Sequence, residues 1–273
     1  MAHEGNLTRA AAKAKLSQSA LSSQIKKLED RLGYPLFDRV GRQLEMTEVG
    51  RIVLDHADQI FGTGQELLAT LQRTSAATPP LRVGATSTLS RNFQIQFLDP
   101  FLRSPETDLV LRSGSDSVLF DALKSLSVDV VLTTEPPHSV FSAGLTAQRI
   151  ARQPVGIHGT PGRLKRKTLN ALLNNEPLIL PTASSIRTGF EALITRLAVT
   201  PRIVAEVDDM AMLRLLARQD VGLAIAPAVV LADEIAAGML QTAPFDLQIE
   251  ENFYAVTVRC NFPHPVLKDL LST

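Results

Sequence analysis

The chain has 273 residues, of which 45% are hydrophobic and 21% charged, a composition typical of soluble globular proteins. Its single cysteine, Cys260, excludes a disulfide framework and a CxxC metal site. The first residues lack a signal-peptide pattern, and no run of about 18 apolar residues could span a bilayer. We therefore expect a cytoplasmic protein with no membrane partner.

The charges are unevenly distributed along the sequence. The whole chain has 28 basic and 28 acidic side chains, a net charge of zero, whereas residues 1–42 have eight basic and four acidic side chains, a local net charge of +4. A basic segment on a neutral chain is typical of a DNA-binding module attached to another domain. Runs of charge often only face solvent, so this interpretation needs support from the predicted elements.

The first predicted elements are two helices joined by a short turn. Residues 6–16 are rich in alanine, which favours helix, and Asn6 or Thr8 can cap it. Ser17 is a candidate N-cap for a second helix over residues 18–31. That helix has apolar side chains at helical spacing, which we expect to face inward: Leu21, Ile25, Leu28 and Leu32.

The opposite face of the second helix is polar. Small polar groups with a lysine can approach base edges and phosphates without steric obstruction, as a recognition helix in the major groove must. The predicted DNA-contacting residues on this face are Gln18, Ser19, Ser22, Ser23 and Lys26. The alternative is an exposed polar face with no partner. Two helices with this division of faces indicate a helix-turn-helix.

A hairpin and a long helix should follow. Leu36 and Phe37 are expected to close the small core, and Arg39 and Arg42 flank a glycine, as in a wing that contacts the minor groove or the DNA backbone. A helix then runs from about residue 47 to 73. Its apolar seam has the alternating steps of a heptad repeat: Val53, Ala57, Ile60, Gly64, Leu67 and Leu71. The heptad favours a dimerising coiled coil over a helix that packs only on its own domain.

After a hinge at residues 74–80, strands and helices alternate. Strands are predicted at 81–85, 109–113 and 128–134, with helices between them, which implies a parallel sheet covered by helices. The pattern restarts with strands and helices at 153–158, 177–181, 186–197, 202–207, 210–218 and 222–227. A last strand at 253–258 should return to the first lobe or close the second. Two α/β lobes with a cleft between them suit a small-molecule receptor.

The N-terminal motifs resemble the LysR-type transcriptional regulator family. The resemblance rests on the alanine pair of the first helix, on Ser17-Gln18, on Leu28-Glu29, and on the Leu-Gly-x-Pro-Leu-Phe-x-Arg run that ends at Arg39. The branch that the chain most resembles is the NhaR type, activators of a sodium/proton antiporter gene. The segments suggesting this branch are residues 4–7, 19–25, 57–61 and 206–213.

The resemblance implies a fold, partners and a function. The fold is α/β, with a winged helix-turn-helix at residues 1–46, a linker helix and hinge at 47–79, and two Rossmann-like lobes of the periplasmic-binding-protein type at 80–273. Members are cytoplasmic, form dimers that pair into tetramers, and bind duplex DNA. They respond to a small molecule or ion between the lobes and recruit RNA polymerase. We therefore expect a transcriptional activator, with a sodium response as one possibility.

One departure from the family concerns the N-terminus. Family members usually have a further helix before this start, and residues 1–4 would supply only its last turn. Leu7, Leu21 and Ile25 would then be partly uncovered. Our hypothesis is that the start is misplaced or that the chain is truncated.

Effector-binding residues are expected where parallel strands end, because ligands bind at the carboxyl edge of open α/β sheets. The candidates from the two lobes are Thr86, Ser87, Ser115, Thr133, Thr134, Thr182, Ser184, Ser185, Arg187 and Asp208. Hydroxyls with Arg187 would suit a small anion. Asp208, Asp209 or Glu206 would instead suit a cation. The hydroxyls could equally serve only as helix caps.

No catalytic residue, metal site or cofactor is expected. The histidines are scattered, without an HExxH or H-x-x-x-H pair, and the glycine-rich residues 156–162 lack the Gly-Lys-Ser/Thr ending of a phosphate loop. No G-x-S-x-G elbow is present. The sequence thus indicates a DNA-binding regulator rather than an enzyme. The alternative is a solute-binding receptor without DNA-binding function, which predicts a secretion signal and no DNA-binding segment.

Overall fold

The computed structural model describes residues 7–40, 43–74, 80–103, 108–137, 144–182, 184–259 and 263–271. The chain divides into two compact units, Met1–Leu68 and Ala69–Thr273. The candidate cap Asn6, the wing residue Arg42 and most of the hinge, residues 75–79, lie outside the described residues.

The first unit begins with the two predicted helices. Helix α1 (Leu7–Lys13) buries two alanines, and α2 (Gln18–Leu32) begins at Ser17, whose hydroxyl accepts a hydrogen bond from the Ala20 amide at 3.1 Å. The chain leaves α2 at Gly33 in the left-handed region, φ 79°, where the Gly33 amide donates to the Glu29 carbonyl. The predicted N-cap is therefore confirmed, and glycine is the residue that this C-terminal turn favours.

The inward face of α2 is only partly covered. Leu21 and Ile25 are half-buried as predicted, but Leu28 and Leu32 are 45% and 42% exposed. The prediction was wrong for these two leucines. Helical spacing places side chains on one face, whereas burial also needs a neighbouring element. The seven-residue α1 is too short to cover the C-terminal half of α2.

The wing is an antiparallel hairpin of β1 (Phe37–Val40) and β2 (Gln43–Met46). Leu36 is buried, as predicted, and Phe37 is half-buried. A carboxylate oxygen of Glu29 accepts from the amides of Leu36 at 2.7 Å and Phe37 at 3.2 Å. These two hydrogen bonds join the hairpin to the last turn of α2.

Helix α3 (Glu48–Thr74) extends without a break through the predicted linker region. Thr47 precedes it, and its hydroxyl accepts from the Gly50 amide at 2.9 Å while donating to the Pro35 carbonyl. Along the predicted seam, Ile60, Leu67 and Leu71 are 70%, 59% and 58% exposed. These three seam residues are therefore exposed in the single chain, whereas Val53 and Ala57 nearer the start of α3 are half-buried.

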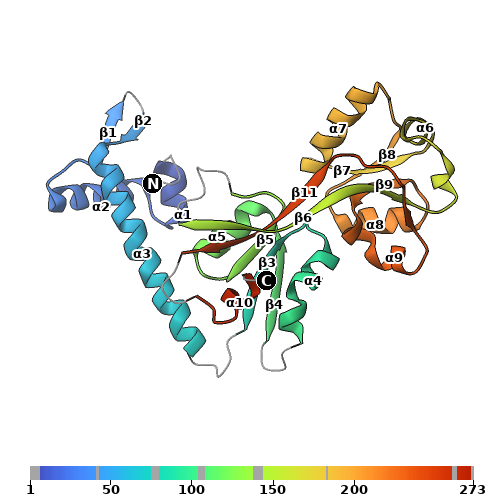
Figure 1. Cartoon of the computed structure of the whole chain (residues 1–273). Coiled ribbons are helices and arrows are strands. Elements are labelled where there is room, and N and C mark those ends of the chain that lie inside the picture. Colours follow the sequence, from blue (N-terminus) through green and yellow to red (C-terminus); the bar gives the residue numbers. More distant parts are fainter. Residues whose placement is uncertain are drawn as a thin grey trace. The chain divides into compact units, whose positions relative to one another are not determined.

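The second unit contains two α/β lobes (Figure 1). In the first lobe β3 (Leu81–Thr86) pairs in parallel with β4 (Leu109–Gly114) and with β5 (Val130–Thr133). In the second, β7 (Leu178–Pro181) pairs in parallel with β8 and β9. The other elements of the unit are α4 (Arg91–Leu102), α5 (Asp116–Lys124), α6 (Leu169–Asn175), α7 (Ser185–Leu197), β8 (Ile203–Val207), α8 (Met210–Arg218), β9 (Leu223–Pro227), α9 (Ala232–Ala236), β10 (Gln241–Thr242) and α10 (Leu267–Leu271), with short 3-10 turns at Arg163–Lys165 and Ala228–Leu231.

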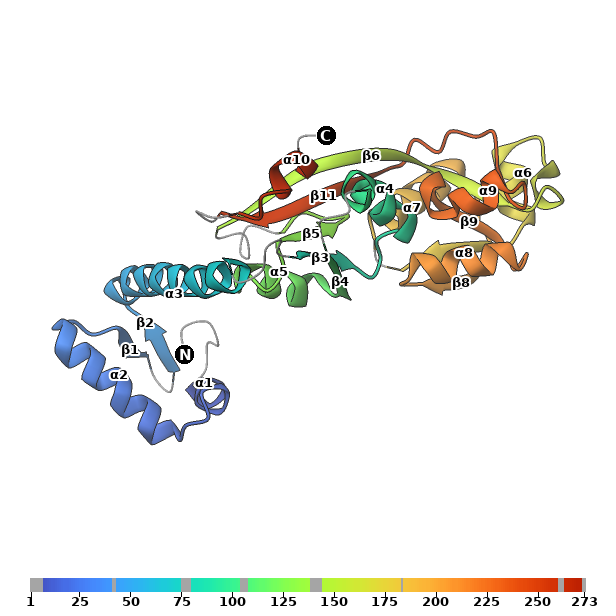
Figure 2. The same cartoon turned by 90° about the horizontal axis from the view of Figure 1, so that it is seen from below.

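Two long antiparallel strands join the lobes: β6 (Leu145–Gly159) and β11 (Glu250–Val258) lie side by side in both views (Figures 1 and 2). Because β11 also pairs with β5 and β6 also pairs with β9, the strand order is β4-β3-β5-β11-β6-β9-β7-β8. Strand β6 begins at Leu145 and not at the predicted residue 153, since its first half is mostly exposed and lacks an apolar run. The last strand, β11, therefore extends through both lobes. The predicted α/β fold class is confirmed.

Strand β11 contributes its inward side chains to the first-lobe core. Phe253 is fully buried and stacks on Phe93 of α4 with ring centroids 3.9 Å apart. Glu251, two residues earlier, is also buried, whereas the neighbouring Glu250 is exposed. The period of two along a strand thus places Glu251 at the end of a buried row. Among the described residues, no helix is long and apolar enough to cross a membrane.

Candidate functional site

The first candidate site is the polar face of α2. All five predicted DNA-contacting side chains on this helix are exposed: Gln18, Ser19, Ser22, Ser23 and Lys26. The amide of Gln18 donates to the Thr8 hydroxyl at 2.5 Å, which ties the start of α2 to α1. The Ser19 hydroxyl lies 3.0 Å from that of Ser17. Arg39 lies on β1 opposite Leu44.

Part of this polar face borders a groove of about 740 Å³ between α1, α2 and the hairpin. Ser22 and Lys26 line its edge, and Ile25, which was expected on the inner face, lines the same groove. The separation into an inner and an outer face is therefore less complete than the sequence suggested. Ser19 and Ser23 lie outside the groove lining.

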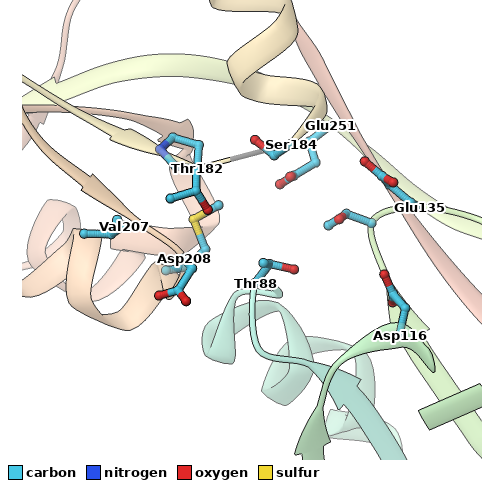
Figure 3. Close-up of a pocket in the computed structure, with 11 residues that line it drawn as sticks. Thr88, Asp116, Glu135, Thr182, Ser184, Val207, Asp208 and Glu251 are labelled. Atoms are coloured by element: carbon cyan, nitrogen blue, oxygen red, sulfur yellow. The ribbon is translucent and has the colours of Figure 1, made fainter. Parts of the chain in front are cut away.

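The second candidate site is a pocket of about 100 Å³ between the two lobes of the second unit (Figure 3). Strands β3, β5, β7 and β8 end at this pocket, as expected for parallel α/β sheets. The lining residues are Thr88, Asp116, Thr134, Glu135, Pro181, Thr182, Ser184, Val207, Asp208, Met210 and Glu251.

Four of the predicted effector-binding residues line this pocket: Thr134, Thr182, Ser184 and Asp208. Two others are buried close to it. The Thr133 hydroxyl donates to the Asp116 carboxylate at 3.1 Å, and the Thr86 hydroxyl accepts from Thr88 at 3.3 Å.

The remaining candidates do not line the pocket: Ser87, Ser115, Ser185 and Arg187. The capping alternative applies to Ser184, whose hydroxyl accepts from the Arg187 amide at 3.2 Å. Ser184 therefore both caps α7 and lines the pocket. Ser115 precedes α5 but makes no side-chain cap bond.

Arg187 is occupied by carboxylates of its own unit. Its Nε donates to Glu191 at 2.6 Å and its terminal nitrogen to Glu206 at 2.9 Å. The hydrogen bonds to Glu191 and then to Glu206 raise the pKa of the Arg187 guanidinium. Arg187 and Glu206 thus neutralise each other instead of offering charge to a ligand. Asp209, another cation candidate, caps α8 by accepting from the Ala211 amide at 2.8 Å.

Sequence reasoning missed three of the four carboxylates in the pocket. Asp116 is the first residue of α5, where an acidic residue is ordinarily read as a partner of the helix dipole. Glu135 follows β5 in an irregular segment. Glu251 lies on a strand whose start was predicted three residues later. With Asp208 they form an acidic lining, and none of the described residues that line the pocket is a lysine, arginine or histidine.

Glu251 is the most unusual of these carboxylates. The residue is 3% exposed, and burial raises the pKa of its carboxyl to about 8. No hydrogen bond or ion pair reaches this carboxyl from the described part of the chain. Glu251 is therefore largely protonated at neutral pH, in a pocket that gives it no partner.

Helix ends oppose this negative charge only in part. Residues at or just before the first turns of α5, α7 and α8 line the pocket. Each helix N-terminus is equivalent to about half a positive charge, so three contribute about +1.5. Asp116, Glu135 and Asp208 outweigh them even while Glu251 is protonated. The pocket therefore favours a cation over the small anion considered from the sequence.

Comparison with known proteins places this architecture in a family. Residues 75–273 match the model described as "LysR substrate binding domain", and residues 1–51 match "Bacterial regulatory helix-turn-helix protein, lysR family". The chain belongs to the LysR-type transcriptional regulators. The family expected from the motifs is confirmed, and the helix-turn-helix match favours a regulator over a solute-binding receptor.

Individual relatives are distant. The transcriptional activator protein NhaR of Escherichia coli is 24% identical over 273 residues, covering 99% of this chain and 90% of that protein. The regulator YwqM of Bacillus subtilis is 25% identical over 241 residues, 86% of this chain and 82% of that protein. The structure of CbnR, a LysR family regulator, has a TM-score of 0.57 at 21% identity, covering 98% and 94% of the two chains. Vibrio fischeri DarR in complex with DNA has a TM-score of 0.56 at 18% identity, covering 98% and 92%.

We predict that Glu251→Gln removes a pH dependence of stability. The folded carboxyl titrates near 8, against an ordinary value of 4.5, so between these pH values the folded protein holds a proton that the unfolded chain has lost. The free energy of unfolding of the wild type should therefore fall by up to about 1.4 kcal/mol per pH unit across this window and level off above it. Urea unfolding of the full chain at a series of pH values measures this slope.

The control for that measurement is Glu250→Gln on the same strand. Glu250 faces the other way and pairs with Arg152 at an exposed position, so its loss should leave the slope unchanged. An equal pH slope in the wild type and in the Glu251→Gln variant would show that Glu251 ionises normally.

Proposed function

We propose that this LysR-type regulator inserts α2 into the major groove of its DNA site, dimerises through α3, and changes its DNA contacts when an effector fills the interlobe pocket. The observation that carries the DNA-binding proposal is the exposed polar face of a helix fixed at both ends. Ser17 caps its start and Glu29 joins its end to the wing. The fixed backbone would hold the polar side chains in a defined register for base contacts.

The proposed DNA-contacting residues differ in role. Ser22 and Ser23 are short enough for base edges, whereas Lys26 and the wing residues Arg39 and Arg42 suit phosphates. Ser22, Ser23 and Lys26 make no hydrogen bond or ion pair to other described residues, so DNA would not have to displace an existing partner. Gln18 is the exception because it is already bonded to Thr8.

We predict that Lys26→Ala and Arg42→Ala each weaken binding to a duplex selected from a random-sequence pool. Each loss should be similar for specific and non-specific duplexes and should lower the slope of log K against log salt by about 0.9. Ser22→Ala should instead relax sequence preference. Gel-shift titrations at several salt concentrations measure both quantities. Lys165→Ala, an equal charge change in the second unit, is the control, and an unchanged slope in the Lys26 and Arg42 variants contradicts the assigned roles.

Dimerisation through α3 is supported by its exposed apolar seam. Ile60, Leu67 and Leu71 lie at heptad positions and are more than half exposed in the single chain, as are Phe61 and Leu68 next to them. Large apolar side chains exposed along one helix face indicate a protein interface. A second copy of α3 has the complementary heptad pattern. By analogy with family members, we infer dimers that pair into tetramers.

We predict that Ile60→Glu dissociates this dimer, because a buried unpaired carboxylate in a coiled-coil seam is strongly unfavourable. Sedimentation equilibrium of the full chain measures the shift to monomer. The matched control is Gln59→Glu, which adds the same charge at an exposed position outside the seam. A wild-type monomer, or equal dissociation in both variants, argues against α3 as the interface.

Whether this protein activates or represses transcription is inferred by analogy with its relatives. NhaR is named a transcriptional activator, and we infer activation, with recruitment of RNA polymerase, for this protein as well. The site of action would be the cytoplasm. One hypothesis is that the regulated gene encodes a sodium/proton antiporter and that sodium is the effector. The acidic pocket is compatible with a positively charged signal.

A further inference from the structure

The acidic pocket shares part of its wall with a second cavity. A groove of about 250 Å³ adjoins it and shares two lining residues with it, Asp116 and Glu135. Phe120, Pro136 and Pro137 supply its apolar surface. Ser117, Asp121 and Lys124 complete the lining of this groove, and the two shared carboxylates face both spaces.

The polar compartment is small and has an unpaired acid in its wall. Its volume of about 100 Å³ holds only a few water molecules, at about 30 Å³ each. Figure 3 shows Asp116 and Glu135 on one side of the pocket and Thr182 and Asp208 on the other, with Glu251 between them. Glu251 is almost fully buried, lines the pocket and has no hydrogen-bond partner among the described residues.

Among the described residues, no three acidic, histidine or cysteine side chains are placed to hold a metal ion. An ammonium group makes different demands, because it carries one charge and three donors and can bind carboxylates that are spread around it. The hydroxyls of Thr134, Thr182 and Ser184 line the same space and offer further acceptors.

We propose that the effector is a small organic ammonium ion whose charged end binds in the acidic pocket, beside Glu251, and whose apolar part lies in the adjoining groove along Phe120. This inference rests on the proposed effector-binding role of the interlobe pocket and specifies its ligand. The ammonium end would give the Glu251 carboxylate a partner, which none of the described residues provides. Burying an apolar part against Phe120, Pro136 and Pro137 would add affinity in proportion to its length.

Binding then releases a proton. In the free protein burial keeps Glu251 protonated up to about pH 8, and a neighbouring ammonium ion favours the ionised carboxylate. The other charged groups that face Glu251 across the pocket are Asp116, Glu135 and Asp208, which are all acidic and also favour a cation. The affinity should therefore rise about tenfold per pH unit on approach to pH 8 and level off above it.

The test is calorimetric titration of the full chain at constant ionic strength. The cationic probes are methylammonium, butylammonium and benzylammonium chloride, and the matched probes are sodium butyrate, sodium benzoate, benzyl alcohol and sodium chloride. We expect the ammonium ions alone to bind, with affinity rising about fourfold per buried CH₂. Glu251→Gln should abolish the pH dependence, and Glu250→Gln should leave it unchanged.

Three results would overturn the inference: binding of benzoate or sodium as tight as that of benzylammonium, equal affinity for methylammonium and benzylammonium, or no heat with any ammonium ion.

The same preparation is tested for duplex binding by gel shift. Retained duplex binding without ammonium binding refutes the ligand class and leaves the proposed DNA-binding function standing. If the wild-type protein does not bind duplex DNA, the proposed DNA-binding function is refuted, whichever ligand the pocket binds.

Discussion

The pairing of β6 with β11 is the constraint on which the second unit depends. These strands are hydrogen-bonded from Glu250 opposite Pro154 to Val258 opposite Leu145, and each also pairs with a strand of one lobe. The lobes are thus joined through a continuous sheet path, with the parallel strand ends of both directed at the same region. A change in the spacing of the lobes must bend or twist these two strands. The interlobe pocket lies between the two lobes that these strands join.

The same strand pair explains the position of the buried acid. Residues on β11 alternate between the core and the surface, and the inward row contains both Phe253 and Glu251. Phe253 is held by its stack on Phe93, so the strand register fixes Glu251 at the edge of the pocket. A carboxyl group buried without a partner is unfavourable when ionised. A cationic ligand beside Glu251 would offset this cost, which no described residue does.

Much of the architecture follows from local sequence. The cap at Ser17 and the long periodic helix α3 are local signals, and the structure confirms both of them. Alternating strands and helices also indicated the parallel lobes. Leu28 was wrongly expected to be buried, because its burial depends on a neighbouring element that helical periodicity does not reveal.

The pocket was only half predictable for a related reason. Thr134, Thr182 and Asp208 follow strand ends, a position that the sequence pattern reveals. Glu251 reaches the pocket through strand pairing over a long sequence separation, which no local pattern encodes. The sequence left the charge of the ligand open, because Arg187 could be assigned to an anion until its bonds to Glu191 and Glu206 were visible. Short-range patterns therefore located the pocket but did not determine its chemistry.

The most direct test of the account is the protonation state of Glu251 itself. Carbon-13 NMR of the glutamate side-chain carboxyls, assigned with the Glu251→Gln variant, gives its titration curve in the full chain. We expect an apparent pKa near 8 in the free protein and a clear decrease in the presence of butylammonium. A titration in the ordinary glutamate range, or a pKa that butylammonium does not change, would contradict it.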